Sequence, residues 1–247
     1  MVFDCTHSVR VKNGAGWRQY GRVRLMISVG KEYHERSKLQ AVVNWINRNV
    51  GISGNGSGIQ EVHVSVNDFL QRHNYMAAGL EEKAAGRAAL QAGDQWLERN
   101  KETLSAIKVP TRFTRWNEWF FTPDFDYVYV SILDYASRDA AFEEAIHTDS
   151  TALARRKEAR CEEVPPALIR HSMNYVREEL AIFAIQSTTM PAAEVYPGSN
   201  LASANYLIGR ELPILMRPLA HRHFTRIDFD RIQPTCHNIL LQQLKIA

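Results

Sequence analysis

A serine stands where an apolar segment gives way to glycine and charged residues, in the stretch LMISVGKEYHERSKLQ (25–40). The pattern predicts a buried strand over 22–30, followed by a helix over 37–49. In open α/β sheets, ligands bind where strands end and helices begin, and Gly30 allows close backbone approach there. Ser28 is therefore either a nucleophile or a turn residue whose hydroxyl satisfies backbone groups.

A tyrosine and a glutamate form a second candidate pair. Tyr175 and Glu179 are four residues apart in a strongly predicted helix, so their side chains share one face. A phenol and a carboxylate at the edge of a core could hold an ammonium group or transfer a proton. The alternative is a plain Tyr–Glu hydrogen bond at a helix boundary. Tyr196 and Pro197 end a short predicted strand, which is a common place for an aromatic residue and a turn proline.

Several well-known motifs are missing. The segment around Ser28 is not GxSxG, GxGxxG or a P-loop, so neither a hydrolase elbow nor a site for a dinucleotide or ATP is expected. The nine histidines show no HExxH or other metal-ligand spacing, and none is an evident base for Ser28. We expect no metal and no cofactor.

Composition favours one globular domain over residues 1–247. No apolar run is long enough to span a membrane, and the N-terminus lacks the apolar core of a signal peptide. Cys5, Cys161 and Cys236 are far apart and odd in number, which suits a reducing compartment. These features predict a cytoplasmic protein.

The formal net charge is only +3, but cationic residues cluster in 154–160, 221–231 and along 81–101. Such clusters could meet phosphates. They could equally be solvated helix faces, because acidic residues are interleaved in each one.

Alternation and helical periodicity outline an α/β fold. A strand over 61–69 follows the helix over 37–49, for which Ser37 is a plausible N-cap, and this order implies a parallel strand pair. The remaining predicted elements are helices over 80–107 and 165–186, and strands over 192–199 and 223–232. The segment 127–136 favours a strand by local propensity although its flanks are helical.

In order and approximate spacing, six segments resemble the cyclodipeptide synthase family. They are ISVGKEYHERSKLQAVVNWI (27–46), NDFLQRHNY (67–75), GDQWLERN (93–100), TRWNEWF (114–120), NYVREEL (174–180) and EVYPGS (194–199). The resemblance covers nearly the whole chain. It implies a Rossmann-like single domain similar to the catalytic domain of class I aminoacyl-tRNA synthetases, and it implies helix at 127–136. The ATP-binding signatures of the synthetases are missing here, which fits a protein that receives amino acids already activated as tRNA esters.

The resemblance also implies an activity. The family joins two aminoacyl groups from aminoacyl-tRNAs into a 2,5-diketopiperazine by a ping-pong mechanism. Ser28 matches the nucleophile that accepts the first aminoacyl group. Tyr175 and Glu179 match the residues that hold its α-amino group, and the glutamate is also implicated in proton transfer. Tyr196 matches a tyrosine involved in positioning and cyclisation.

Two positions place the chain beside the XYP subfamily rather than the NYQ subfamily. Lys31 stands where the NYQ group has asparagine, and Pro197 stands where it has glutamine. Lys31 either touches substrate or is a surface lysine that caps a helix. A first aminoacyl pocket, which suits a non-bulky or apolar residue, is predicted from Met26, Val64, Val66, Phe183 and Ile185. Gly30, Lys31 and Pro197 are further predicted substrate-binding residues.

Aminoacyl-tRNAs are the predicted partners, without DNA or membrane binding, and the chain is expected to be a monomer or weak dimer. Four basic residues of the helix over 80–107 are predicted to contact the acceptor stem: Lys83, Arg87, Arg99 and Lys101. Two rival hypotheses are a synthetase-like module that binds tRNA without catalysis and a Rossmann-type serine hydrolase. The set of four catalytic candidates disfavours the first, and the absence of a recognisable triad disfavours the second.

Overall fold

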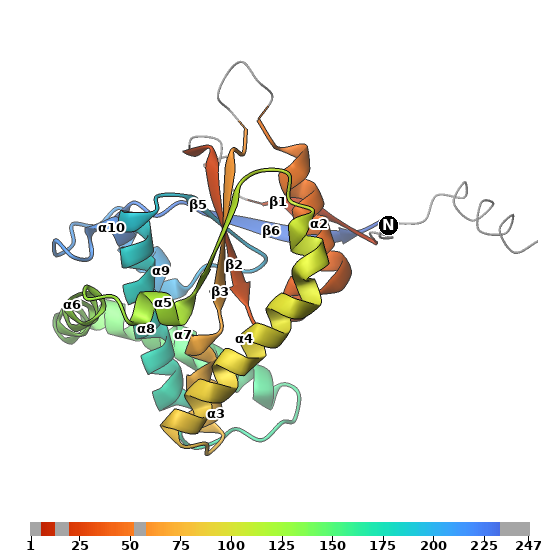
Figure 1. The fold of residues 1–247 in the computed structure, drawn as a ribbon. Helices are drawn as coiled ribbons and strands as arrows, with labels where there is room; N and C mark the ends of the chain where they lie inside the picture. Colours follow the sequence, from red (N-terminus) through yellow and green to blue (C-terminus); the bar gives the residue numbers. More distant parts are fainter. Residues whose placement is uncertain (1–5, 13–19, 52–57, 233–247) are drawn as a thin grey trace, which may run out of the picture.

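The computed structural model describes residues 6–12, 20–51 and 58–232. Six strands form one sheet in the order β1-β6-β5-β2-β3-β4. The strands are β1 (His7–Val11), β2 (Arg22–Ser28), β3 (Glu61–Asn67), β4 (Thr111–Arg115), β5 (Ala193–Tyr196) and β6 (Phe224–Arg231). Only β1 runs antiparallel to its neighbour, and β6, β5, β2, β3 and β4 are parallel. This confirms the predicted Rossmann-like α/β fold (Figure 1).

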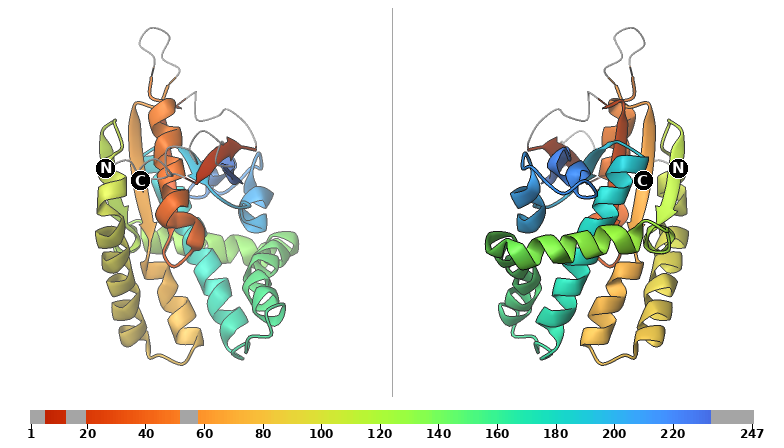
Figure 2. Two further views of the ribbon diagram at one scale, coloured as in Figure 1. Left: turned by 90° about the vertical axis from the view of Figure 1, so that its right-hand side faces the viewer. Right: turned by 90° about the vertical axis from the view of Figure 1, so that its left-hand side faces the viewer.

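Helices cover both faces of the sheet. They are α2 (Arg36–Arg48), α3 (Arg72–Ala77), α4 (Glu82–Ser105), α5 (Trp116–Phe120), α6 (Phe125–Arg138), α7 (Ala140–Glu158), α8 (Leu168–Thr189), α9 (Ala202–Leu207) and α10 (Arg217–Ala220), with short 3-10 turns η1 (Glu32–His34) and η2 (Phe69–Gln71). The two views of Figure 2 look first onto α2 and α4 and then onto α8 with α6 lying across it.

Two hydrophobic cores lie on opposite faces of the sheet because successive side chains of a strand alternate between its faces. Val23, Leu25 and Ile27 of β2 pack with the α2 and α4 layer. Met26, between two of them, packs with α8 and the helices around it. Each residue of β2 is therefore assigned to one layer by its position in the strand.

The predicted elements correspond to β2, β3, β5, β6, α2, α4 and α8, and the segment 127–136 lies within α6. The helix implied by the family resemblance is thus confirmed there against local propensity. The prediction of Ser37 as an N-cap is wrong: α2 begins at Arg36 with Glu35 as its N-cap, and the Ser37 hydroxyl instead contacts His7 Nδ1 at 3.0 Å.

The strands β1 and β4 were not predicted from the sequence. Cys5 and Cys236 lie outside the described residues. Within those that are described, no helix combines the length and the apolar character needed to cross a membrane.

Candidate active site

Ser28 is the last residue of β2, at the carboxyl edge of the parallel strands. The chain turns at once, because the Lys31 N–H donates to the Ser28 carbonyl at 3.2 Å and Gly30 has a φ of +83°. A residue other than glycine rarely adopts that conformation. A Cβ at Gly30 would meet no atom within 4 Å, so backbone conformation rather than crowding within the chain requires glycine here.

Three hydroxyl groups form a chain that starts at Ser28. The Ser28 Oγ lies 3.1 Å from Tyr196 Oη, which in turn lies 2.7 Å from Tyr33 Oη. Burial raises the pKa of Tyr196 and of Tyr33, so both phenols stay protonated near neutral pH. Ser28 is thus hydrogen-bonded to a neutral hydroxyl relay and not to a charged base. Tyr33 was missed in the sequence because nothing in KEYHE distinguishes it from a surface residue.

A buried histidine holds the backbone of Ser28. The Ser28 N–H donates to His34 Nδ1 at 2.9 Å, and Trp96 Nε1–H of α4 donates to the His34 carbonyl at 3.0 Å. Burial lowers the pKa of His34 to about 3, so the imidazole is neutral. His34 therefore positions the serine through its backbone.

Tyr175 and Glu179 project from α8 toward the same region. Gln71 Nε2 donates to Tyr175 Oη at 3.4 Å. Burial raises the pKa of Tyr175, and the nearby Glu179, Tyr196 and Tyr33 raise it further. Tyr175 therefore lies close enough to Glu179, Tyr196 and Tyr33 for their charges to affect its pKa.

Glu179 is almost fully buried, at 9% exposure. Burial raises the pKa of its carboxyl from the ordinary value of 4.5 to about 8, although the Arg222 guanidinium opposes this. The carboxyl is therefore mostly protonated at neutral pH. A group that titrates near pH 8 is well matched to an α-amino group, whose ordinary pKa is about 7.7–8.0.

An ion pair fixes α8 next to these residues. Arg72 of α3 donates to both oxygens of Glu178, at 2.7 and 2.8 Å, and His73 Nε2 contacts the same carboxylate at 2.9 Å. All three side chains are buried. Glu178 directly precedes Glu179, so the ion pair between Arg72 and Glu178 fixes the position and rotation of α8 next to the candidate site.

The residues predicted for the first pocket do not all meet. Met26 and Phe183 belong to the core on the α8 side. Val64 and Val66 pack in the opposite core, with α2 and α4. Ser65, which lies between Val64 and Val66 and pairs in register with Met26, faces the α8 side, where it accepts a hydrogen bond from Gln186.

Polar groups border the same region. The Arg222 guanidinium lies 3.8 Å from the centre of the Phe183 ring and pairs with the buried Glu194. The pocket side of the sheet is therefore more polar than the sequence indicated.

Two further predicted residues lie near the turn after β2. Pro197 is buried directly after Tyr196. Lys31 is half-buried, and its pKa is lowered first by burial and then by Arg156 of α7 and by Arg160, which follows that helix. Lys31 is thus not a freely solvated surface lysine.

The four predicted tRNA contacts are exposed on α4 but do not share one face. With 3.6 residues per turn, Lys83 and Lys101 point the same way and Arg87 lies close to them, whereas Arg99 is about 160° away from Lys83. Arg99 instead lines a cavity of about 890 Å³ between α4 and the start of α2.

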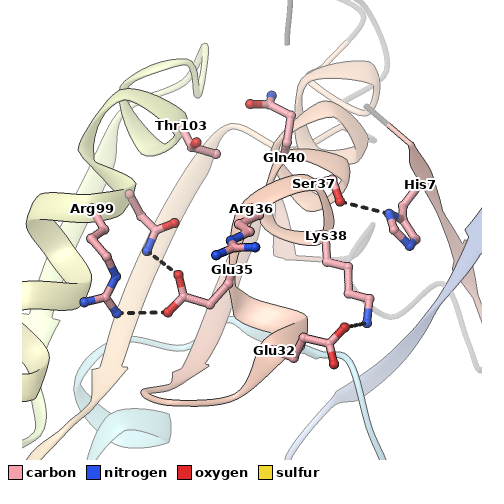
Figure 3. A pocket seen from close by; sticks show the side chains of 10 residues that line it. His7, Glu32, Glu35, Arg36, Ser37, Lys38, Gln40, Arg99 and Thr103 are labelled. Carbon is pink, nitrogen blue, oxygen red and sulfur yellow. Dashed lines mark hydrogen bonds and ion pairs between the residues drawn. The ribbon is translucent and has the colours of Figure 1, made fainter. Parts of the chain in front are cut away.

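Figure 3 shows the side chains of this cavity, which is separate from Ser28. Arg99 pairs with Glu35 at 3.1 Å, and Lys38 pairs with Glu32 at 2.6 Å. Two of its cationic side chains are thus already neutralised by glutamates.

Comparison with known proteins places this geometry in a known fold. The sequence matches no protein-family model and no curated protein. A cyclodipeptide synthase from Fluoribacter dumoffii superposes with a TM-score of 0.77 at 21% identity, over 92% of this chain and 100% of that one. A cyclodipeptide synthase from Candidatus Glomeribacter gigasporarum, solved bound to Phe-tRNAPhe, gives 0.63 at 19% identity, over 87% and 89%.

A Mycobacterium tuberculosis protein, whose structure demonstrated that cyclodipeptide synthetases are related to type I tRNA synthetases, gives a TM-score of 0.65 at 14% identity, over 92% and 94%. The chain therefore has the Rossmann-like fold seen in cyclodipeptide synthases.

Proposed function

We propose that this chain is a tRNA-dependent cyclodipeptide synthase, an aminoacyltransferase that joins two aminoacyl groups into a 2,5-diketopiperazine. The observation that carries the proposal is the contact of Ser28 Oγ with Tyr196 Oη at 3.1 Å, at the carboxyl edge of the parallel strands. Tyr175 and Glu179 on the facing helix supply groups suited to an amine. The fold shared with solved cyclodipeptide synthases supports the same conclusion.

In the first half-reaction, Ser28 Oγ attacks the carbonyl carbon of an aminoacyl-tRNA ester. The bond between that carbon and the ribose oxygen breaks, and the ribose oxygen takes the serine proton, so that one ester replaces another. Tyr196 and Tyr33 remain neutral hydroxyls, so they orient the serine and do not act as a strong base. This exchange needs no ATP because the donor ester is already activated.

In the second half-reaction, the amine of the serine-bound aminoacyl group attacks the ester of a second aminoacyl-tRNA. This forms an amide bond and releases the second tRNA. The new terminal amine then attacks the serine ester, which closes the six-membered ring and returns the proton to Ser28 Oγ. Glu179 has a pKa of about 8, so part of its population is ionised near neutral pH. That ionised fraction can accept the proton that each attacking amine loses and pass it to the leaving oxygen.

The partners of this chain are proposed to be aminoacyl-tRNAs, in the cytoplasm, and the whole chain is proposed to be one synthase domain. Lys83, Arg87 and Lys101, which lie on one side of α4, are the better candidates for contact with tRNA phosphates. Lys31 and Pro197 support assignment to the XYP subfamily.

The test is a product screen. Purified protein and its Ser28→Ala variant are incubated with a full set of aminoacyl-tRNAs, and the extracts are searched by mass spectrometry for diketopiperazines. A cyclic dipeptide formed by the wild type alone supports the reaction and identifies both substrates. The absence of product, combined with salt-sensitive tRNA binding, would instead favour the non-catalytic module.

A further inference from the structure

Asn67 lies beside Ser28 on the neighbouring strand. The two residues are register partners at the ends of the parallel strands β2 and β3. Partners in neighbouring strands direct their side chains to the same face of a sheet, and such strands are about 4.8 Å apart. The Asn67 side chain therefore belongs to the same edge and the same face as the Ser28 hydroxyl.

The carboxamide of Asn67 is buried and incompletely satisfied. Asn67 is 1% exposed, and its Oδ1 has no hydrogen-bond partner among the described residues. The other two side chains that β3 directs to this face do have partners: His63 contacts Thr114, and Ser65 accepts from Gln186. A buried acceptor without a partner is costly and calls for an explanation.

The backbone at this point is held firmly. Asp68, the next residue, accepts from the Phe69 N–H at 2.6 Å and pairs with Arg115 at 2.5 Å. Arg115 also donates to the Leu90 carbonyl of α4 at 2.6 Å. Asn67 is thus held by its neighbours while its own amide oxygen is left without a partner.

We infer that Asn67 is a substrate-binding residue whose Oδ1 accepts a hydrogen bond from the α-ammonium group of the aminoacyl chain carried by Ser28. This inference rests on the proposed function. In an aminoacyl ester of Ser28, the α-nitrogen is three bonds from Oγ, so it can reach a side chain on the adjacent strand. An ammonium group has three N–H donors. Tyr175 and Glu179 provide two acceptors, and Asn67 provides the third.

The experiment compares two substrates in single-turnover acylation of Ser28, followed by intact-protein mass. One substrate is the aminoacyl-tRNA that the product screen identifies as first donor. The other is the same tRNA after deamination, which replaces the α-amino group by a hydroxyl with a single donor. The variants are Asn67→Leu, which has a similar volume, and Asn67→Ala, which needs no extra space should leucine not fit.

The inference predicts that both Asn67 variants acylate about tenfold more slowly with the aminoacyl substrate and within twofold of wild type with the deaminated one. The thermal unfolding midpoint of Asn67→Leu should be unchanged or higher, because the substitution removes a buried oxygen that has no partner among the described residues. Ser65→Ala is the matched control: it loses the bond to Gln186, so it should be less stable but keep the wild-type preference for the amino group.

Equal slowing with both substrates would overturn the inference and point to the terminal ribose or to a structural role. Unchanged rates with both would overturn it as well. If the wild type forms no acyl-enzyme with any aminoacyl-tRNA, the proposed function fails, and the inference fails with it.

Discussion

Ser28 and Tyr196 are 168 residues apart in the chain, yet their hydroxyl groups share a hydrogen bond of 3.1 Å. The contact arises because β2 and β5 are parallel neighbours whose carboxyl ends meet at one edge of the sheet. Tyr33, directly after the turn, extends the contact into a chain of three hydroxyls. These three hydrogen-bonded hydroxyls join a candidate nucleophile to groups that stay neutral. A neutral arrangement suits an exchange of esters better than hydrolysis driven by a strong base.

Incubation with a single aminoacyl-tRNA should label the protein. Without a second substrate the aminoacyl group should remain on Ser28, and the intact protein mass should rise by one aminoacyl residue. Ser28→Ala should show no increase but should still bind tRNA. A mass increase that persists in Ser28→Ala would place the acyl group on another residue.

Substitution of Tyr196 should harm acylation more than substitution of Tyr33. Tyr196→Phe removes the direct bond to Ser28 Oγ, which corresponds to a loss of about tenfold in rate. Tyr33→Phe leaves that bond in place and should cost only a few-fold. Single-turnover acylation measures both rates. An unchanged rate in Tyr196→Phe would show that its hydroxyl does not orient the serine.

Glu179 should make the protein less stable as pH rises from 5 to 8. The unfolded chain loses this proton above the ordinary pKa of 4.5, whereas the folded protein keeps it until about 8. The folded state therefore binds more protons in this window. The free energy of unfolding should fall by at most about 1.4 kcal/mol per pH unit from this group.

Urea unfolding at pH 5 and pH 8 tests this with Glu179→Gln, which cannot ionise. The stability of the variant relative to wild type should increase between these pH values. Parallel pH dependences in the two proteins would mean that Glu179 titrates normally.

Two glycines of α4 should respond in opposite ways to alanine. A Cβ at Gly93 would lie 2.2 Å from Asp68 Oδ2, a carboxylate held by Arg115. Gly93→Ala should therefore destabilise the protein by about 1–3 kcal/mol. At Gly86 the nearest atom is Phe69 Cε2 at 3.5 Å, so Gly86→Ala should stabilise it by up to about 1 kcal/mol through helix propensity.

Denaturant unfolding of both alanine variants provides the comparison. If the Gly93→Ala variant has the same free energy of unfolding as the Gly86→Ala variant, Asp68 moves aside freely.

The basic residues of α4 should not contribute equally to tRNA binding. Lys83→Ala and Lys101→Ala should each weaken binding and reduce the slope of log affinity against log salt by about 1. Arg99→Ala should have a smaller effect, because Arg99 points away from that side and pairs with Glu35. Titrations at several salt concentrations measure the slopes, and a larger effect of Arg99→Ala would move the tRNA surface to the α2 side.

Much of the fold could be predicted from local patterns. The run RVRLMIS is rich in apolar and β-branched residues and forms β2, and the shared face of Tyr175 and Glu179 follows from helical spacing alone. Such features depend on residues a few positions apart, so the sequence contains them directly. The segment 127–136 was the exception. Its aromatic and β-branched residues favour a strand, but the segment is helical as part of α6, whose buried residues pack against α8.

The sequence by itself determined that a strand begins at Arg22 and runs through Ser28, that a glycine follows the serine at the turn, and that Tyr175 and Glu179 share one helix face. Only the tertiary structure decided which residues stand beside the serine. Alternation along β3 did not decide whether Val66 or Asn67 lies on the same face as Ser28. The register of β3 against β2 placed Asn67 next to Ser28 and turned Val66 to the other core. Register is set by contacts between segments far apart in the chain, and a shift of one residue would have reversed every side chain.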